Sequence, residues 1–170
     1  MVLVNILFRS IIRRSISSGE ARVALFDRVF NKCNQLSGND RASSGERIIA
    51  FYDGKCDLCV SEIRHYQNLL RTKDARIAFF DLAESPTSTR NILTEFGIPE
   101  SAPFRRVHVV TEYKLDVLVS TEAFCEIWSR VPYWHRIVPF VRNVPGVRIL
   151  SDLVYACIAE TRLKLLPSNP

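Results

Sequence analysis

Along the chain, the spacing of hydrophobic residues alternates between a pattern typical of buried strands and a pattern typical of one helix face. Each change of pattern marks the start of another expected element. Residues 48–52 (IIAFY) form a continuous apolar run rich in β-forming residues, which is typical of a strand covered on both faces, and residues 77–82 (IAFFDL) are predicted as another buried strand. Between these runs, apolar side chains recur at the spacing of one helix face: Cys59, Val60, Ile63, Tyr66 and Leu70. The pattern predicts a helix over residues 57–72 and a βαβ unit, because parallel strands need such a crossover.

The second half of the chain predicts a hairpin and further helices. Ser85-Pro86 is a helix start, and Gly97 ends that helix. The next expected elements are strands over 105–111 and 115–120, a helix over 121–130, a broken segment over 132–146 and an amphipathic helix over 150–165. Strand, helix, strand, helix, strand, strand, helix is the element order of the thioredoxin fold. We therefore predict an α/β, thioredoxin-like fold: a central mixed four-stranded sheet flanked by helices, with extra C-terminal helices.

The N-terminus differs in composition from the rest of the chain. The first nineteen residues hold three arginines, four serines and no acidic residue. This composition is typical of a mitochondrial transit peptide, and the alternative is an amphipathic helix lying on the domain. A short amphipathic helix over 20–36 and a Gly/Ser-rich linker over 37–46 follow. We predict a targeting leader with this helix over 1–36, a compact domain over 47–166 and a location in the mitochondrial matrix.

Composition narrows the function classes. The 170 residues are 47% hydrophobic and 24% charged, which suits one folded domain with one core. The net charge of +5 comes without a basic run carrying interleaved aromatics, so we predict no nucleic-acid partner. Glycine-rich phosphate-binding motifs are missing, and we predict no cofactor. No apolar stretch reaches the roughly 20 residues of a membrane-spanning helix. Residues 131–150, punctuated by Pro and Arg, either pack on the core or lie at a membrane surface, and packing is favoured.

The most informative stretch is YDGKCDLCVSEI, which carries a CxxC pair at the corner between the first strand and its helix. Cys56 lies next to the helix N-terminus, where backbone N–H groups and the helix dipole favour a thiolate. Cys59 lies one turn later on the same face and is placed to resolve a mixed disulfide. Lys55 favours the Cys56 thiolate, whereas Asp53 and Asp57 oppose it. The pattern predicts a redox-active centre in which Cys56 attacks and Cys59 resolves.

Other interpretations of these residues stay open. Asp53 either shapes the Asp-Gly turn or accepts the proton of Cys59. The two cysteines are also compatible with a zinc site or with buried structural thiols. A zinc site needs two more ligands, and no second CxxC or H-x-x-x-H supplies them, so we predict no metal. The candidate ligands are scattered along the chain: Cys33, Cys125, Cys157, His65, His108 and His135. Five cysteines, an odd number, favour a reducing compartment over a disulfide scaffold.

The residues around the pair also resemble a known family. Residues 53–59 (DGKCDLC) match the D-G-x-C-x-L-C motif of the DCC family of thiol-disulfide oxidoreductases, which is similar to thioredoxins in fold. FFDLAES resembles that family's second strand and acidic loop. The C-terminal pattern of Pro145, Tyr155, Ala159 and Arg162 is similar too, so the resemblance covers residues 47–166. It implies disulfide exchange with a protein or small-molecule substrate.

The chain departs from thioredoxins in two ways. Asp57-Leu58 stands between the cysteines, where thioredoxins carry Gly-Pro. Thioredoxins also place a cis-proline immediately before the third strand, and Pro103 is the nearby candidate.

The rival hypothesis is a non-enzymatic interaction or assembly module. In that case five arginines form a docking face for a partner or for anionic lipid in a peripheral membrane contact. These are Arg105, Arg106, Arg136, Arg142 and Arg148.

Overall fold

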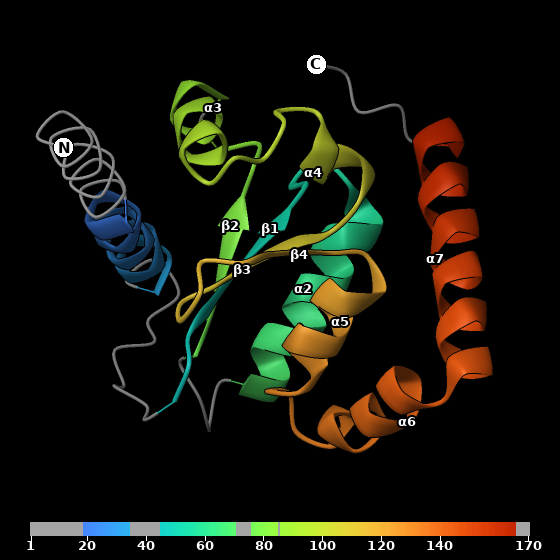
Figure 1. Cartoon of the computed structure of the whole chain (residues 1–170). Coiled ribbons are helices and arrows are strands. Elements are labelled where there is room, and N and C mark those ends of the chain that lie inside the picture. Colours follow the sequence, from blue (N-terminus) through green and yellow to red (C-terminus); the bar gives the residue numbers. More distant parts are fainter. Residues whose placement is uncertain (1–18, 35–44, 71–75, 85, 166–170) are drawn as a thin grey trace, which may run out of the picture.

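A four-stranded mixed sheet forms the centre of the molecule (Figure 1). The computed structural model describes residues 19–34, 45–70, 76–84 and 86–165. The strands are β1 (Ile48–Tyr52), β2 (Ile77–Asp81), β3 (His108–Thr111) and β4 (Val117–Val119), in the order β2-β1-β3-β4. β1 pairs parallel with β2 and antiparallel with β3, and β3 pairs antiparallel with β4. The predicted mixed sheet of the thioredoxin-like fold is confirmed.

Helices cover both faces of this sheet. An N-terminal helix over residues 19–34 precedes β1. The other helices are α2 (Asp57–Leu70), α3 (Pro86–Glu95), α4 (Ala102–Arg105), α5 (Thr121–Trp128), the 3-10 turn η1 (Trp134–Arg136), α6 (Val138–Asn143) and α7 (Pro145–Leu165). The extra C-terminal helices are therefore present as predicted.

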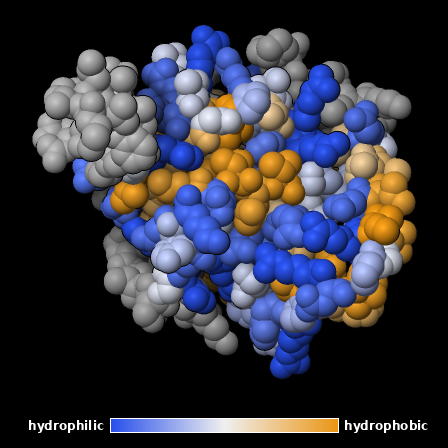
Figure 2. All heavy atoms as spheres, viewed as in Figure 1, coloured by the Kyte–Doolittle hydropathy of each residue, from blue (hydrophilic) through white to orange (hydrophobic). Residues whose placement is uncertain are grey.

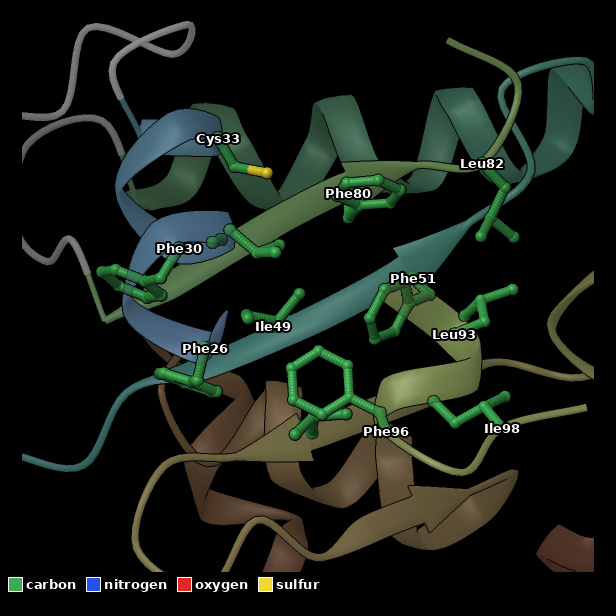
Figure 3. Close-up of a cluster of buried hydrophobic side chains, with 13 residues drawn as sticks. Phe26, Phe30, Cys33, Ile49, Phe51, Phe80, Leu82, Leu93, Phe96 and Ile98 are labelled. Carbon is green, nitrogen blue, oxygen red and sulfur yellow. The ribbon is translucent and has the colours of Figure 1, made fainter. Parts of the chain in front are cut away.

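Alternation along β1 divides the core into two layers. Ile49 and Phe51 point to the face covered by the N-terminal helix and α3, where aromatic rings gather around Phe51 (Figure 3). The Phe51 ring lies 5.5 Å from that of Phe80 and 6.3 Å from that of Phe96, centroid to centroid. Ile48 points to the opposite face, which α2 and α5 cover. Because both faces are covered, the strand is a continuous apolar run.

The N-terminal helix is part of this core. Phe26 and Phe30 of the helix are buried against the sheet, so the packed unit extends before the predicted domain start at Arg47. Arg47 fastens the helix further. Its guanidinium forms ion pairs with Asp27 of the helix and with Glu112, and it lies 5.6 and 4.9 Å from the two phenylalanine ring centroids. The predicted leader and nearly all of the predicted linker lie outside the described residues.

Two predicted elements differ most from their expected bounds. The expected strand over 105–111 is shorter, because Pro103 lies in the first turn of α4 and that helix includes Arg105. The expected final helix over 150–165 begins earlier, at Pro145, again with proline at its first position. The expected buried face of this helix is also not buried.

The exposure of α7 follows from its position. Leu153, Val154 and Ile158 are 60%, 50% and 49% exposed. α7 lies beside α4, α5 and α6 and does not cover a face of the sheet (Figure 1). Its hydrophobic side chains therefore reach the surface, along the right-hand side of Figure 2.

Candidate functional site

The two cysteines lie where the predicted strand-to-helix corner places them. The Cys56 N–H donates to the Asp53 carbonyl at 3.1 Å, which closes the turn before α2. Cys56 then occupies the position immediately before the helix, and its Sγ accepts the backbone N–H of Cys59 at 3.3 Å. A thiolate at Cys56 gains from this hydrogen bond and from the positive end of the helix dipole.

The burial of the two side chains is unequal. Cys56 is only 3% exposed, whereas Cys59 is half-buried and lines an apolar groove. A molecule in that groove therefore meets Cys59 first. That Cys56 attacks and Cys59 resolves stays a prediction.

The charged residues next to the two cysteines differ in how far they are buried. Asp53 is 3% exposed, and its Oδ1 accepts the Lys55 N–H at 3.0 Å. That bond is the turn-forming interaction foreseen for Asp53. The side chains of Lys55 and Asp57 are exposed, so solvent screens their effect on the cysteines.

A second carboxylate, which the sequence reasoning missed, holds the CxxC turn. Asp81 at the end of β2 accepts the Gly54 N–H at 3.1 Å and the Ala83 N–H at 2.8 Å through Oδ1. A Cβ at Gly54 would lie 2.1 Å from Asp81 Oδ2, so glycine is needed for this close approach. The sequence offered only the position of Asp81 within the predicted second strand, and the structure pairs Asp81 with Tyr52, next to the turn.

An apolar groove lies beside the pair, bounded by α2, α5 and α7. Its volume is about 810 Å³, and we call it the α7 groove. Hydrophobic side chains from the three helices form most of its wall: Leu58, Phe124, Trp128, Leu150, Val154 and Ile158. Cys59 and Glu62 of α2 also line it. Apolar walls with a few converging polar groups are typical of ligand sites.

Glu62 is the second residue that the sequence reasoning missed. It lies one helical turn after Cys59, and it accepts a hydrogen bond from the Tyr66 hydroxyl at 2.6 Å. The Tyr66 oxygen in turn accepts the Trp128 Nε1–H at 2.9 Å. Burial raises the pKa of Glu62, and the bond from Tyr66 only partly opposes this rise. A glutamate on the apolar face of the predicted helix was the available signal.

Comparison with known proteins agrees with this site. Residues 50–167, which include both cysteines, match the family model of the DCC1-like thiol-disulfide oxidoreductases. The chain belongs to this family. No curated protein and no solved structure matches it.

In this DCC1-like chain, both backbone polar groups of Val107, the residue before β3, form hydrogen bonds within the protein. The Val107 N–H donates to the Tyr155 hydroxyl of α7 at 2.8 Å, and the Val107 carbonyl accepts the Ser120 N–H at 3.1 Å. Pro103, the candidate cis-proline, lies in α4, and the peptide bonds of the described ranges are all trans. A substrate strand that paired with the Val107 N–H would have to displace Tyr155.

The residues considered for zinc do not assemble in the described part of the DCC1-like domain. There, no group of three or more His, Cys, Asp or Glu side chains is placed to hold a metal ion. Burial raises the pKa of the Cys33 thiol to about 11, with a further contribution from the charge of Glu84. Burial also raises the pKa of Cys125, whereas Cys157 is exposed.

Two of the five arginines proposed as a docking face are engaged within the domain. Arg142 pairs with Glu126 at 2.8 Å, and Arg148 pairs with Glu122 at 2.9 Å. The remaining three have exposed side chains: Arg105, Arg106 and Arg136. Within the described ranges, none of the helices combines the length and the apolar character needed to cross a bilayer.

Proposed function

We propose that this protein catalyses thiol–disulfide exchange through Cys56 and Cys59. The observation that carries the proposal is the 3.3 Å contact from the Cys59 N–H to Cys56 Sγ, at a helix N-terminus beside the α7 groove. One thiolate attacks a substrate disulfide and forms a mixed disulfide while the first substrate thiolate leaves. The second cysteine then attacks the sulfur of the first cysteine, so the Cys56–Cys59 disulfide forms and the second substrate thiolate leaves.

The reaction is tested by a redox titration of the full chain against glutathione buffers. We expect a reversible two-electron couple in the wild type and its loss in both Cys56→Ser and Cys59→Ser. A wild-type protein without such a couple, carrying one equivalent of zinc, would support the non-enzymatic alternative.

Two features of the site favour different orders of attack. The helix N-terminus stabilises a thiolate at Cys56, whereas the groove exposes Cys59. The single variants separate the orders, because a variant that retains only the attacking cysteine accumulates the mixed disulfide. Mass spectrometry of each variant after mixing with a disulfide substrate identifies that cysteine. Trapping on Cys59, in Cys56→Ser, would show that access outweighs thiolate stabilisation.

We further propose that the substrate disulfide is flanked by apolar groups, because the walls of the α7 groove are apolar. Two adjacent residues of α7 provide a matched test. Val154 lines the groove and Leu153 does not, although both side chains are at least half exposed. We expect Val154→Glu to raise KM for an apolar peptide disulfide while Leu153→Glu leaves it unchanged. Equal effects of the two substitutions would contradict binding in the groove.

We also propose import into the mitochondrial matrix, supported by the arginines, serines and missing acids of residues 1–19. Residues 1–35 fused to a reporter should direct it to mitochondria. A cytosolic reporter would refute the proposal.

A further inference from the structure

Glu62 is a titratable group in the α7 groove for which the exchange reaction described above has no role. Glu62 and Cys59 both line this groove. They stand three residues apart on α2, and side chains at this spacing are neighbours on one helix face, with Cβ atoms about 5–6 Å apart. A carboxylate in apolar surroundings beside a thiol is a candidate proton acceptor.

The hydrogen bonds of Glu62 hold it in place and leave it able to take a proton. The Tyr66 hydroxyl donates a hydrogen bond to its Oε1. Tyr66 is itself fixed by Trp128 of α5, so the carboxylate is held from two elements. A carboxylate has two oxygens and about four acceptor sites, and a single hydroxyl donor does not fill them.

Other titratable groups line the same groove from β1, the turn after it, α2 and α7. They are Tyr52 at the end of β1, Asp53 in the turn, His65 and Tyr66 on α2, and Tyr155 on α7. Asp53 accepts the Lys55 N–H within the turn, and the Tyr155 hydroxyl accepts the Val107 N–H. Burial raises the pKa of Tyr52 to about 12, so it stays protonated near neutral pH. His65 is exposed, and its proximity favours the ionised form of Glu62.

We infer that Glu62 accepts the proton of the Cys59 thiol and returns it to the departing thiolate, an inference that rests on the proposed exchange reaction. The S–H proton of Cys59 passes to a Glu62 oxygen, and the resulting thiolate attacks one sulfur of a disulfide. That S–S bond breaks, a new S–S bond to Cys59 forms, and the other sulfur leaves as a thiolate. Glu62 then returns its proton to this thiolate, so protons and electrons balance whichever cysteine attacks first.

The inference predicts that Glu62→Gln slows disulfide exchange and at the same time makes the Cys59 thiol easier to ionise. Disulfide exchange by the full chain at pH 7 should slow by about 100-fold, the lower end of what general acid–base catalysis contributes. The pH midpoint for alkylation of Cys59, read site by site by mass spectrometry, should fall by about 1 unit because a neighbouring negative charge is removed. Loss of a merely structural hydrogen bond would not lower this midpoint.

Three further variants serve as controls. Glu62→Asp keeps a carboxylate and should recover part of the exchange rate, whereas Tyr66→Phe keeps Glu62 but removes the bond that holds it and should slow exchange less than Glu62→Gln does. Glu100→Gln changes an exposed glutamate paired with Arg90, outside the groove, and should behave as wild type. An unchanged Cys59 midpoint in Glu62→Gln, or an exchange rate within about twofold of wild type, would overturn the inference. If the wild type itself exchanges no disulfide, the proposed function fails, and the alkylation midpoints still test the coupling of Glu62 to Cys59.

Discussion

Gly54→Ala tests whether the contact between the CxxC turn and Asp81 positions the cysteines. The new methyl group would lie 2.1 Å from Asp81 Oδ2, so the carboxylate must retreat by about 1 Å or more to reach ordinary contact. That movement removes the 3.1 Å bond from the Gly54 N–H. A hydrogen bond to a charged group contributes about 1.5–3 kcal/mol, and overpacking costs about 1–3 kcal/mol. Since both costs describe one partly relaxed contact, we expect a loss of about 2–4 kcal/mol in unfolding free energy.

Backbone strain does not account for this cost, because Gly54 is outside the left-handed region that Gly45 and Gly97 occupy. Gly146→Ala is the matched control. Its added Cβ meets no atom within 4 Å, and it lies in α7, where alanine should be neutral or stabilising by up to about 1 kcal/mol. Urea denaturation measures both variants.

A double variant tests the cause of the loss. If Asp81 is responsible, Gly54→Ala should cost at least about 1 kcal/mol less in an Asp81→Ala background, because the two residues are in contact. A cost that is the same in both backgrounds, or below about 0.5 kcal/mol in the first, would refute the reasoning. Alkylation of Cys59 should change together with stability if this contact also sets the geometry of the pair.

Three further outcomes are expected. Arg47→Gln should lower the unfolding free energy by about 1–2 kcal/mol in urea denaturation, because it removes two partly exposed ion pairs and the cation stacked on Phe30. An unchanged unfolding free energy would mean that the N-terminal helix is held by apolar packing alone. Burial lowers the pKa of His108 below 6.5, so the unfolded chain binds its proton first and stability should fall as the pH drops below about 6.5. In a plot of the urea midpoint against pH, His108→Gln should remove this fall, whereas His135→Gln, at an exposed position, should leave it in place. The same fall in both variants would exclude His108 as its cause. Cys33, with its pKa raised to about 11, should resist alkylation at pH 8 until urea unfolds the chain, and fast native labelling would contradict its burial.

Local pattern was sufficient for the part of the fold that carries the motif. β1 has the predicted bounds, and α2 begins at the predicted Asp57, because a doubly covered strand and a one-sided helix leave different periods in the sequence. The position of Cys56 at the helix start follows from the same signals. Chain order alone also determined the mixed sheet, since a crossover makes strands parallel and a hairpin makes them antiparallel.

Burial and long-range contacts were decided only by the tertiary structure. The greater exposure of Cys59 than of Cys56 depends on which elements pack around the turn and the start of α2, and helical spacing carries no information on that. The Asp81 bond to Gly54 spans 27 residues, and the Trp128 bond to Tyr66 spans 62. Periodicity reports which face of an element is apolar, but the partner that meets this face is chosen by the packing of the whole chain. For that reason the sequence by itself determined where the two cysteines lie, and the folded structure determined which sulfur and which carboxylate face the groove.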